Sequence, residues 1–234
     1  MEIIYGKNPV KEALTSGSRK FFEIMIAREH YDDIAALAHK VPINTLPKRE
    51  LEKISGTRSH QGVVARVSCY SYVRLKDLTD LKVIILLDSV EDPQNLGSII
   101  RSAYALAQAG IIIPENRSAH ITPSVVKASA GATEHTRIAR VTNLRMASKE
   151  LKKHGFWLVG LDASGKETLQ NIPSYDKLAL VLGGEDTGIR TGMENEIDIM
   201  AHIPMQGSFN SLNVAHSAAI GLYELVTRQH SRSS

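Results

Sequence analysis

Polar side chains that could bind a substrate or a cofactor gather in three short stretches of this chain. The first is "DSVEDPQNLGSIIRSA" (residues 88–103), the second is "GGEDTGIR" (residues 183–190), and the third is "GSFNSLNVAHS" (residues 207–217). Each follows an apolar run with the composition of a buried strand. Because parallel strands place their carboxyl ends at one edge of a sheet, three such loops predict one shared site.

Several groups in these stretches have the chemistry of a binding site, but each also has a purely structural explanation. Asn95 could cap the helix that follows it. Arg101 lies among apolar residues of that helix, so it needs an anionic partner or a route to solvent. That partner is either Asp88 or Glu91 in an ion pair, or the phosphate of a ligand. Glu185 is either a surface charge or a group of the site.

Motifs of several other enzyme classes are missing from the sequence. It contains no G-x-G-x-x-G fingerprint, no G-K-[ST] phosphate loop and no H-E-x-x-H pair, and Cys69 is the only cysteine. These absences argue against a dinucleotide-dependent oxidoreductase, a hydrolase and a metalloenzyme, so we predict no metal site. His216, in the last helix, is expected to be a partly buried packing residue.

An alternation of strands and helices must position the three polar stretches. Strands are expected at "KVIILLDSV", "IIIP", "FWLVGLD", "LALVLGG" and "IMAHIP". Helices are expected at "NLGSIIRSAYALAQAG", "PSVVKASAGA", "ASKELKKHG" and from about residue 211 to 228. This order is typical of a parallel sheet with helices on both faces. Residues 81–234 are therefore expected to form one α/β domain.

The first 70 residues are expected to form a separate, smaller α/β domain. Helical spacing is present in "NPVKEALTSG", "YDDIAALAHK" and "KRELEKISG", and strands are expected at "FFEIMIA" and "GVVARVSCY". In the first helix Asn8 is the expected cap, and Gly17 is the expected end. The polar stretch "SYVRLKDLTD" follows, so residues 71–80 are predicted to be a linker.

The composition is that of a globular protein, with 43% hydrophobic and 23% charged residues and a net charge of +3. No apolar stretch is long enough to span a membrane, and the first residues do not resemble a secretory signal. We therefore expect a cytoplasmic protein that does not bind membranes. Residues 1–70 hold 11 Lys and Arg against 8 Asp and Glu, whereas the remaining residues hold 17 of each. This basic surplus permits binding to a phosphate backbone.

In their order and spacing, "DPQNLGSIIRSA", "LVLGGEDTGIR" and "IPMQGSFNSLNVAHSAAIGLYE" resemble the three motifs of the SpoU, or TrmH-like, family of RNA ribose 2′-O-methyltransferases. The resemblance extends over residues 82–228 and includes "HITPSVVKASAGATEH" and "ARVTNL". "YGKNPVKEAL" and "SHQGVVA" are similar to the small RNA-binding domain of one branch of the family. That branch methylates a guanosine of large-subunit ribosomal RNA.

The resemblance implies a fold and an activity for the chain. The fold would be a small N-terminal α/β RNA-binding domain and an α/β methyltransferase domain of the SPOUT type, whose C-terminal segment forms a deep trefoil knot. Hydrophobic periodicity cannot reveal a knot. The activity would be methyl transfer from S-adenosylmethionine to a ribose of ribosomal RNA, by a homodimer joined through the SPOUT domain.

The resemblance also implies roles for individual residues. Catalytic roles fall on Asn95, Arg101, Glu185, Ser211 and Asn213. Backbone contacts to S-adenosylmethionine fall on Gly183, Ile203 and Leu212. Arg101 could be a base or a phosphate clamp, and we favour the clamp because a guanidinium stays protonated in proteins.

Two alternative functions stay open at this point. One is the same chemistry on transfer RNA or on another ribosomal nucleotide, and the other is a noncatalytic RNA-binding factor for ribosome assembly. The separate N-terminal domain favours ribosomal RNA. The intact set of five matched catalytic positions favours an active enzyme.

Overall fold

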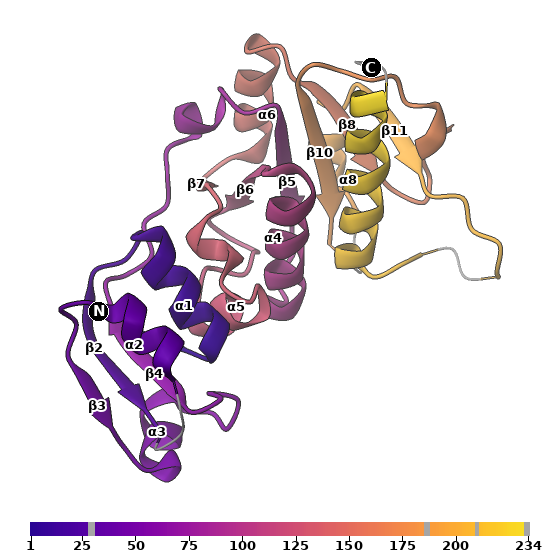
Figure 1. The fold of residues 1–234 in the computed structure, drawn as a ribbon. Coiled ribbons are helices and arrows are strands. Elements are labelled where there is room, and N and C mark those ends of the chain that lie inside the picture. The colour runs from indigo at the N-terminus through magenta and orange to yellow at the C-terminus, as the bar shows by residue number, and fades with distance from the viewer. Residues whose placement is uncertain (28–30, 185–187, 209–210, 232–234) are drawn as a thin grey trace. The chain divides into compact units, whose positions relative to one another are not determined.

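The chain forms two compact units, which the computed structural model describes over residues 1–27, 31–184, 188–208 and 211–231 (Figure 1). The first unit comprises Met1–Ser71 together with His120–His135, and the second comprises Tyr72–Ala119 and Thr136–Ser234. The segment His120–His135 was expected in the larger domain, but its contacts place it in the first unit. The predicted functional boundaries, at residues 70 and 81, stay a prediction.

A four-stranded sheet in the order β1-β4-β2-β3 forms the centre of the first unit. Its strands are β1 (Glu2–Tyr5), β2 (Phe21–Ile26), β3 (Ile43–Thr45) and β4 (Val63–Val67). β4 pairs antiparallel with β1 and β2, and β3 pairs parallel with β2. The strands expected at "FFEIMIA" and "GVVARVSCY" are confirmed. The sequence did not predict β1 and β3, which are too short to give a clear alternation.

The helices of the first unit are α1 (Lys7–Ser16), α2 (Asp32–Ala38), α3 (Lys48–Ser55), α5 (Pro123–Ala128) and the short 3-10 helix η2 (Ala132–Glu134). The expected cap of α1 at Asn8 is wrong, because the helix already begins after Gly6. Gly17 and Gly56 end α1 and α3 in the left-handed conformation that glycine adopts without strain.

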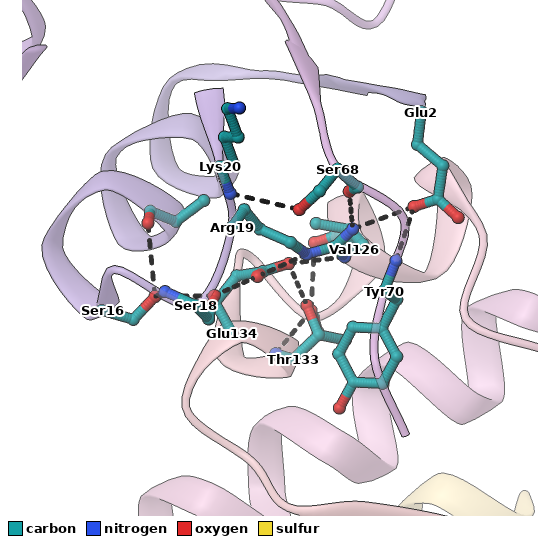
Figure 2. A network of polar contacts seen from close by, with 12 residues as sticks. Glu2, Ser16, Ser18, Arg19, Lys20, Ser68, Tyr70, Val126, Thr133 and Glu134 are labelled. Atoms are coloured by element: carbon teal, nitrogen blue, oxygen red, sulfur yellow. Dashed lines mark hydrogen bonds and ion pairs between the residues drawn. The ribbon is translucent and has the colours of Figure 1, made fainter. Parts of the chain in front are cut away.

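Arg19 is the centre of a buried charge cluster in the first unit (Figure 2). Its Nε and Nη2 donate to the two carboxylate oxygens of Glu134 at 2.9 and 3.0 Å, and its Nη1 donates to Glu2 at 2.9 Å. The side chains of Arg19 and Glu134 are 1% and 0% exposed. Burial alone would lower the pKa of Arg19, but the two carboxylates raise it above its ordinary value. This cluster attaches the His120–His135 segment to the other residues of the unit.

The second unit contains a seven-stranded parallel sheet in the order β7-β6-β5-β10-β8-β11-β9. Its strands are β5 (Val83–Asp88), β6 (Gly110–Pro114), β7 (Ile138–Val141), β8 (Trp157–Leu161), β9 (Glu167–Thr168), β10 (Leu178–Gly183) and β11 (Ile199–His202). All six neighbouring pairs are parallel. The predicted parallel sheet is confirmed, and all six residues of its interior strand β5 are buried, as the continuous apolar run indicates.

Helices cover both faces of this sheet (Figure 1). α4 (Pro93–Ala107) and α8 (Val214–Ser231) pack against each other on one face, where Gly221 of α8 approaches Leu180 of β10. α6 (Leu144–Lys153) and α7 (Thr191–Glu194) lie on the other face, where they share a core with Ile84 and Leu86 of β5. The 3-10 helices η1 (Leu75–Leu78) and η3 (Leu169–Asn171) complete the unit. None of the helices in the described ranges is both long and apolar enough to span a membrane.

Candidate active site

A cavity opens at the carboxyl ends of β8, β10 and β11, within the second unit. Its walls are largely glycine and apolar residues, and we call it the glycine-lined cavity. The residues around it include Asp162, Gly183, Gly184, Gly188, Ile203, Met205, Ser211 and Leu212. The loops after β8, β10 and β11 therefore meet here, at the edge where parallel sheets bind their ligands, and they include residues of the second and third polar stretches. No residue of the first polar stretch, residues 88–103, which the structure describes in full, lines the cavity, so the expected meeting of all three stretches is not found here.

Four of the predicted site residues lie together in the glycine-lined cavity. Gly183 ends β10, Ile203 follows β11, and Ser211 and Leu212 precede α8. These positions are distant along the chain, so it is the order of the strands that brings them together. The role of each residue in cofactor binding or catalysis stays a prediction.

Close packing of the backbone accounts for the glycines after β10. A Cβ atom on Gly183 would lie only 2.0 Å from the carbonyl carbon of Gly188, so a larger residue does not fit there. Gly188 has a φ of 59°, and its amide donates to the carbonyl of Gly184 at 3.0 Å. The backbone of Gly184 and that of Gly188 are thus held together at the wall of the cavity.

Asn95 and Asn213, two of the predicted catalytic residues, bind each other. Asn213 Nδ2 donates to Asn95 Oδ1 at 3.0 Å, and the amide of Ala215 donates to Asn213 Oδ1 at 2.9 Å. The pair joins the first turn of α4 to the residue just before α8. The interpretation of Asn95 as a helix cap is wrong, because the side chain of Asp92 caps α4 by accepting from the amide of Gln94.

Arg101 lies on the exposed side of α4 and does not line the glycine-lined cavity. Within the described part of the chain its guanidinium has no hydrogen-bond or ion-pair partner. Arg101 therefore forms no ion pair with Asp88 or Glu91, the two partners considered from the sequence. The sequence correctly required either a partner or a route to solvent, and the structure provides the route to solvent. The guanidinium is available to an incoming anion.

Asp88 pairs with Arg190 instead. Asp88 is fully buried at the end of β5, and it accepts from the backbone amide of Arg190 at 3.0 Å and from its Nε at 2.7 Å. Because Arg190 ends the second polar stretch, the pair attaches the end of that loop to the centre of the sheet. Sequence reasoning did not identify this contact, since 102 positions separate the two residues.

Asp162 is a residue of the cavity that the sequence reasoning did not single out. Burial alone would raise the pKa of its carboxyl, but hydrogen bonds from the hydroxyl and the amide of Ser164 lower it below the ordinary value. A negative charge is thus held at the cavity wall. Asp162 could have been found from the sequence, because it is the polar last residue of the strand expected at "FWLVGLD".

Two residues of the expected site lie outside the described residues. They are Glu185, the remaining predicted catalytic residue, and Asn210 of the third polar stretch. His216 is described, and it is exposed on α8. Its interpretation as a partly buried packing residue is therefore wrong.

Comparison with known proteins identifies the family. The sequence model of the SpoU rRNA methylase family matches residues 82–223, and the model for RNA 2′-O ribose methyltransferase substrate binding matches residues 3–73. The chain belongs to the SpoU rRNA methylase family. It is thus an RNA methyltransferase, and the family predicted from the three polar stretches is confirmed.

Relatives match this chain along nearly all of its length. YacO of Bacillus subtilis, whose name places it in the TrmH family of tRNA/rRNA methyltransferases, is 37% identical over 98% of this chain and 96% of its own. The SpoU methyltransferase AviRb of Streptomyces viridochromogenes, solved in complex with AdoMet, is 26% identical, with a TM-score of 0.84 over 98% of this chain and 90% of its own. An AdoMet-bound rRNA methyltransferase of Sinorhizobium meliloti is also 26% identical, with a TM-score of 0.82 over 98% of this chain and 87% of its own.

Proposed function

We propose that this protein transfers a methyl group from S-adenosylmethionine to a ribose 2′-hydroxyl of large-subunit ribosomal RNA, at a guanosine in a loop. The observation that carries the proposal is the glycine-lined cavity, where four residues assigned from the family motifs meet. Family membership supports the reaction class, and the AdoMet complex of AviRb supports the methyl donor.

The residues of the cavity fit the chemistry of this donor. Ile203 and Leu212 would offer apolar surface to the bound donor, and the backbone around Gly183 would offer it hydrogen bonds. The carboxylate of Asp162 would accept hydrogen bonds from the donor's ribose hydroxyls and attract its positive charge. When bound, S-adenosylmethionine supplies an activated methyl group on a positively charged sulfur.

The RNA ribose must be held in line with the methyl group, and its hydroxyl must lose a proton. We assign Arg101 to bind an RNA phosphate through two parallel hydrogen bonds, which would position the ribose. The bond between Asn95 and Asn213 would keep the first turns of α4 and α8 in place around the site. The catalytic roles assigned to Glu185 and Ser211 by the family motifs belong to the same proposal.

The first unit would select the RNA. It contains the match to the substrate-binding model and the basic surplus of residues 1–70. Proteins that recognise RNA sequence usually bind unpaired loop nucleotides, which supports a loop as the target. The full-length likeness to the S. meliloti rRNA methyltransferase favours ribosomal over transfer RNA. The alternatives are transfer RNA, another ribosomal nucleotide, and a noncatalytic role in ribosome assembly.

We further propose a homodimer formed through α4 and α8. Four large apolar residues of this helix pair are exposed: Tyr104 and Leu106 on α4, and Ile220 and Tyr223 on α8. An exposed apolar surface of this kind is typical of an interface between subunits. The trefoil knot and the cytoplasmic location expected from the sequence stay predictions.

The experiment that tests the function is methyl transfer from labelled S-adenosylmethionine to RNA. Unmodified large-subunit ribosomal RNA, transfer RNA and ribosome-assembly intermediates would be assayed in parallel, and the products digested and mapped by mass spectrometry. We expect one 2′-O-methylated guanosine in large-subunit RNA, which disappears when Arg101 is replaced by alanine.

Other outcomes of this assay would decide between the alternatives. Methylation of transfer RNA alone would replace the proposed substrate and keep the chemistry. Cofactor binding without transfer to any of the three substrates would support the noncatalytic RNA-binding factor and overturn the enzyme.

A further inference from the structure

A second hollow lies at the carboxyl ends of β6 and β7, in the second unit. Three arginines line it, and we call it the arginine cleft. Arg117 comes from the loop after β6, Arg145 from the first turn of α6, and Arg190 from the residue before α7. The cleft is open to solvent, and Asn116 and Asn143 also line it. Its position is distinct from that of the glycine-lined cavity, with which it shares no described residue.

The charge of the arginine cleft is positive. Among the described residues that line it there is no Asp or Glu. Arg145 donates through Nε to Glu196 at 2.7 Å, and Arg190 is held by Asp88, so carboxylates outside the lining hold two of the guanidinium groups in place. Such fixed, planar donors bind phosphate oxygens well.

Arg117 differs from the other two arginines of the cleft. It is exposed, and no described residue forms a hydrogen bond or an ion pair with it. Its φ of 57° lies in the left-handed region, which is unusual for a side chain of this size. Both ends of its loop are fixed, because the amide of Glu115 donates to Val141 and the amide of Ala119 donates to Val90. A strained backbone that presents an unpaired cation indicates a binding role.

The loop after β10 connects the arginine cleft to the glycine-lined cavity. Gly183, Gly184 and Gly188 line the cavity, and Arg190, two residues later, lines the cleft. An RNA strand that brings one ribose to the methyl donor also brings its neighbouring nucleotides to the surface around the glycine-lined cavity. The cleft lies at the same carboxyl edge of the sheet, on the side of β6 and β7.

We infer that the arginine cleft binds the phosphodiester backbone of the RNA beside the target nucleotide, with Arg117 as its principal contact. The inference rests on the proposed function, because it takes RNA as the substrate. Phosphate contacts position a nucleic acid without reading its sequence. The cleft therefore adds affinity and orientation on the methyltransferase unit itself, and base selection is left to other residues.

The test compares the variants Arg117→Ala and Arg117→Lys with the wild-type chain and a control, Lys153→Ala. Lys153 is a good control because it also carries one positive charge on the second unit, is 72% exposed, and lies at the opposite end of α6 from Arg145. The probe is an unmodified large-subunit RNA transcript, and its affinity is measured by fluorescence anisotropy at several salt concentrations. Binding of S-adenosylmethionine and methyl transfer are measured on the same samples.

We expect Arg117→Ala to weaken RNA binding about 10-fold near 0.1 M salt, and to reduce the slope of log affinity against log salt by about one. Arg117→Lys should retain most of the slope, since it keeps the charge. Lys153→Ala should change RNA affinity less than about twofold. All four proteins should bind S-adenosylmethionine equally.

Two results would overturn the inference. The first is RNA affinity and salt slope in Arg117→Ala equal to those of the wild type, while the wild type methylates RNA. The second is a wild type and an Arg117→Ala variant that bind RNA equally well, while inorganic phosphate raises the thermal stability of the wild type alone. That result would make the cleft a site for free anions. A wild-type chain that neither binds nor methylates RNA would instead contradict the proposed function, and the inference with it.

Discussion

Arg101 could act as a base or as a clamp for an RNA phosphate, and the two roles can be told apart by experiment. Its exposed guanidinium has no described partner, so it can bind a substrate phosphate without first breaking an ion pair. We predict that Arg101→Ala lowers methyl transfer by about 100-fold, the scale of a lost positioning group. Affinity for S-adenosylmethionine should stay within about twofold, because Arg101 does not line the cavity. Single-turnover transfer and calorimetric titration of the donor would measure the two effects.

Arg101→Lys serves as the matched control for this prediction. Lysine keeps the positive charge but lacks the planar fork, so transfer should fall between the wild type and the alanine variant. A collapse of cofactor affinity in Arg101→Ala would contradict the prediction and place the residue in the cofactor site.

Asn213 has a structural role that can be tested apart from catalysis. Its amide joins α4 to α8 through Asn95, and its oxygen accepts from the amide of Ala215 at the start of α8. Asn213→Ala removes both bonds, and we predict a loss of about 1–3 kcal/mol in the free energy of unfolding. Asn213→Asp should lose less, because it keeps the acceptor for Ala215. Urea denaturation followed by circular dichroism would measure both, and equal stability of the three proteins would refute the role.

Residues differ in how far the sequence could predict them. Gly183, Ile203, Ser211 and Leu212 were predicted from motifs and do meet in one cavity, because Gly183 ends β10, Ile203 follows β11, and the other two lie shortly before α8. The partner of Asp88 could not be predicted, since a pairing across 102 positions leaves no local pattern. Whether His216 and Arg101 are exposed depends on which elements pack against α8 and α4, and the spacing of apolar residues in the sequence does not reveal this.

At the scale of secondary structure, the segment that holds α5 and η2 depends on one buried ion pair. Glu134 accepts from Ser18 at 2.6 Å as well as from Arg19, and its side chain is fully buried. Glu134→Ala would leave the Arg19 charge buried with Glu2 as its remaining carboxylate. We predict a loss of about 3–5 kcal/mol in the free energy of unfolding.

A matched control for Glu134 lies nearby. Glu12 pairs with His135 at 2.8 Å, but its side chain is 39% exposed, so Glu12→Ala should cost less than about 1 kcal/mol. Denaturant unfolding monitored by circular dichroism would compare the two variants. Equal losses would show that burial of the Arg19 cluster adds nothing. Deleting residues 1–71 is not a suitable test of RNA binding, because the deletion would remove Arg19 and leave the buried carboxylate of Glu134 without its partner.

The elements themselves were predictable where burial is continuous. β5 and β10 are apolar along nearly their whole length, and a strand buried on both faces of a parallel sheet requires that pattern. β1, β3 and β9 have four residues or fewer and give no usable periodicity. The membership of α5 in the first unit rests on long-range contacts, so the sequence assigned it to the larger domain with its neighbours in the chain.

At the scale of the whole molecule, the helix pair α4 and α8 has two kinds of exposed residue. Arg101 and the apolar side chains of Tyr104 and Leu106 are on α4, and Ile220 and Tyr223 are on α8. A twofold dimer through this pair would bury the apolar residues of both subunits in one self-complementary surface. It would also place Arg101 of each subunit beside that surface, because Arg101 and Tyr104 are about one helical turn apart on α4. Dimer formation and methyl transfer should therefore be linked.

We predict that Ile220→Asp and Tyr223→Glu convert the proposed dimer to monomers and reduce methyl transfer with it. A carboxylate placed in an apolar interface loses its hydration without gaining a partner. The cost is about 3 kcal/mol, which weakens association of the subunits by about 100-fold or more. Met146→Glu is the control, because Met146 is 61% exposed on α6, at the opposite face of the sheet. Sedimentation velocity would measure the oligomeric state, and circular dichroism would verify that the variants fold. Variants that stay dimeric would show that another surface joins the subunits, whereas active monomers would show that one chain contains the complete active site.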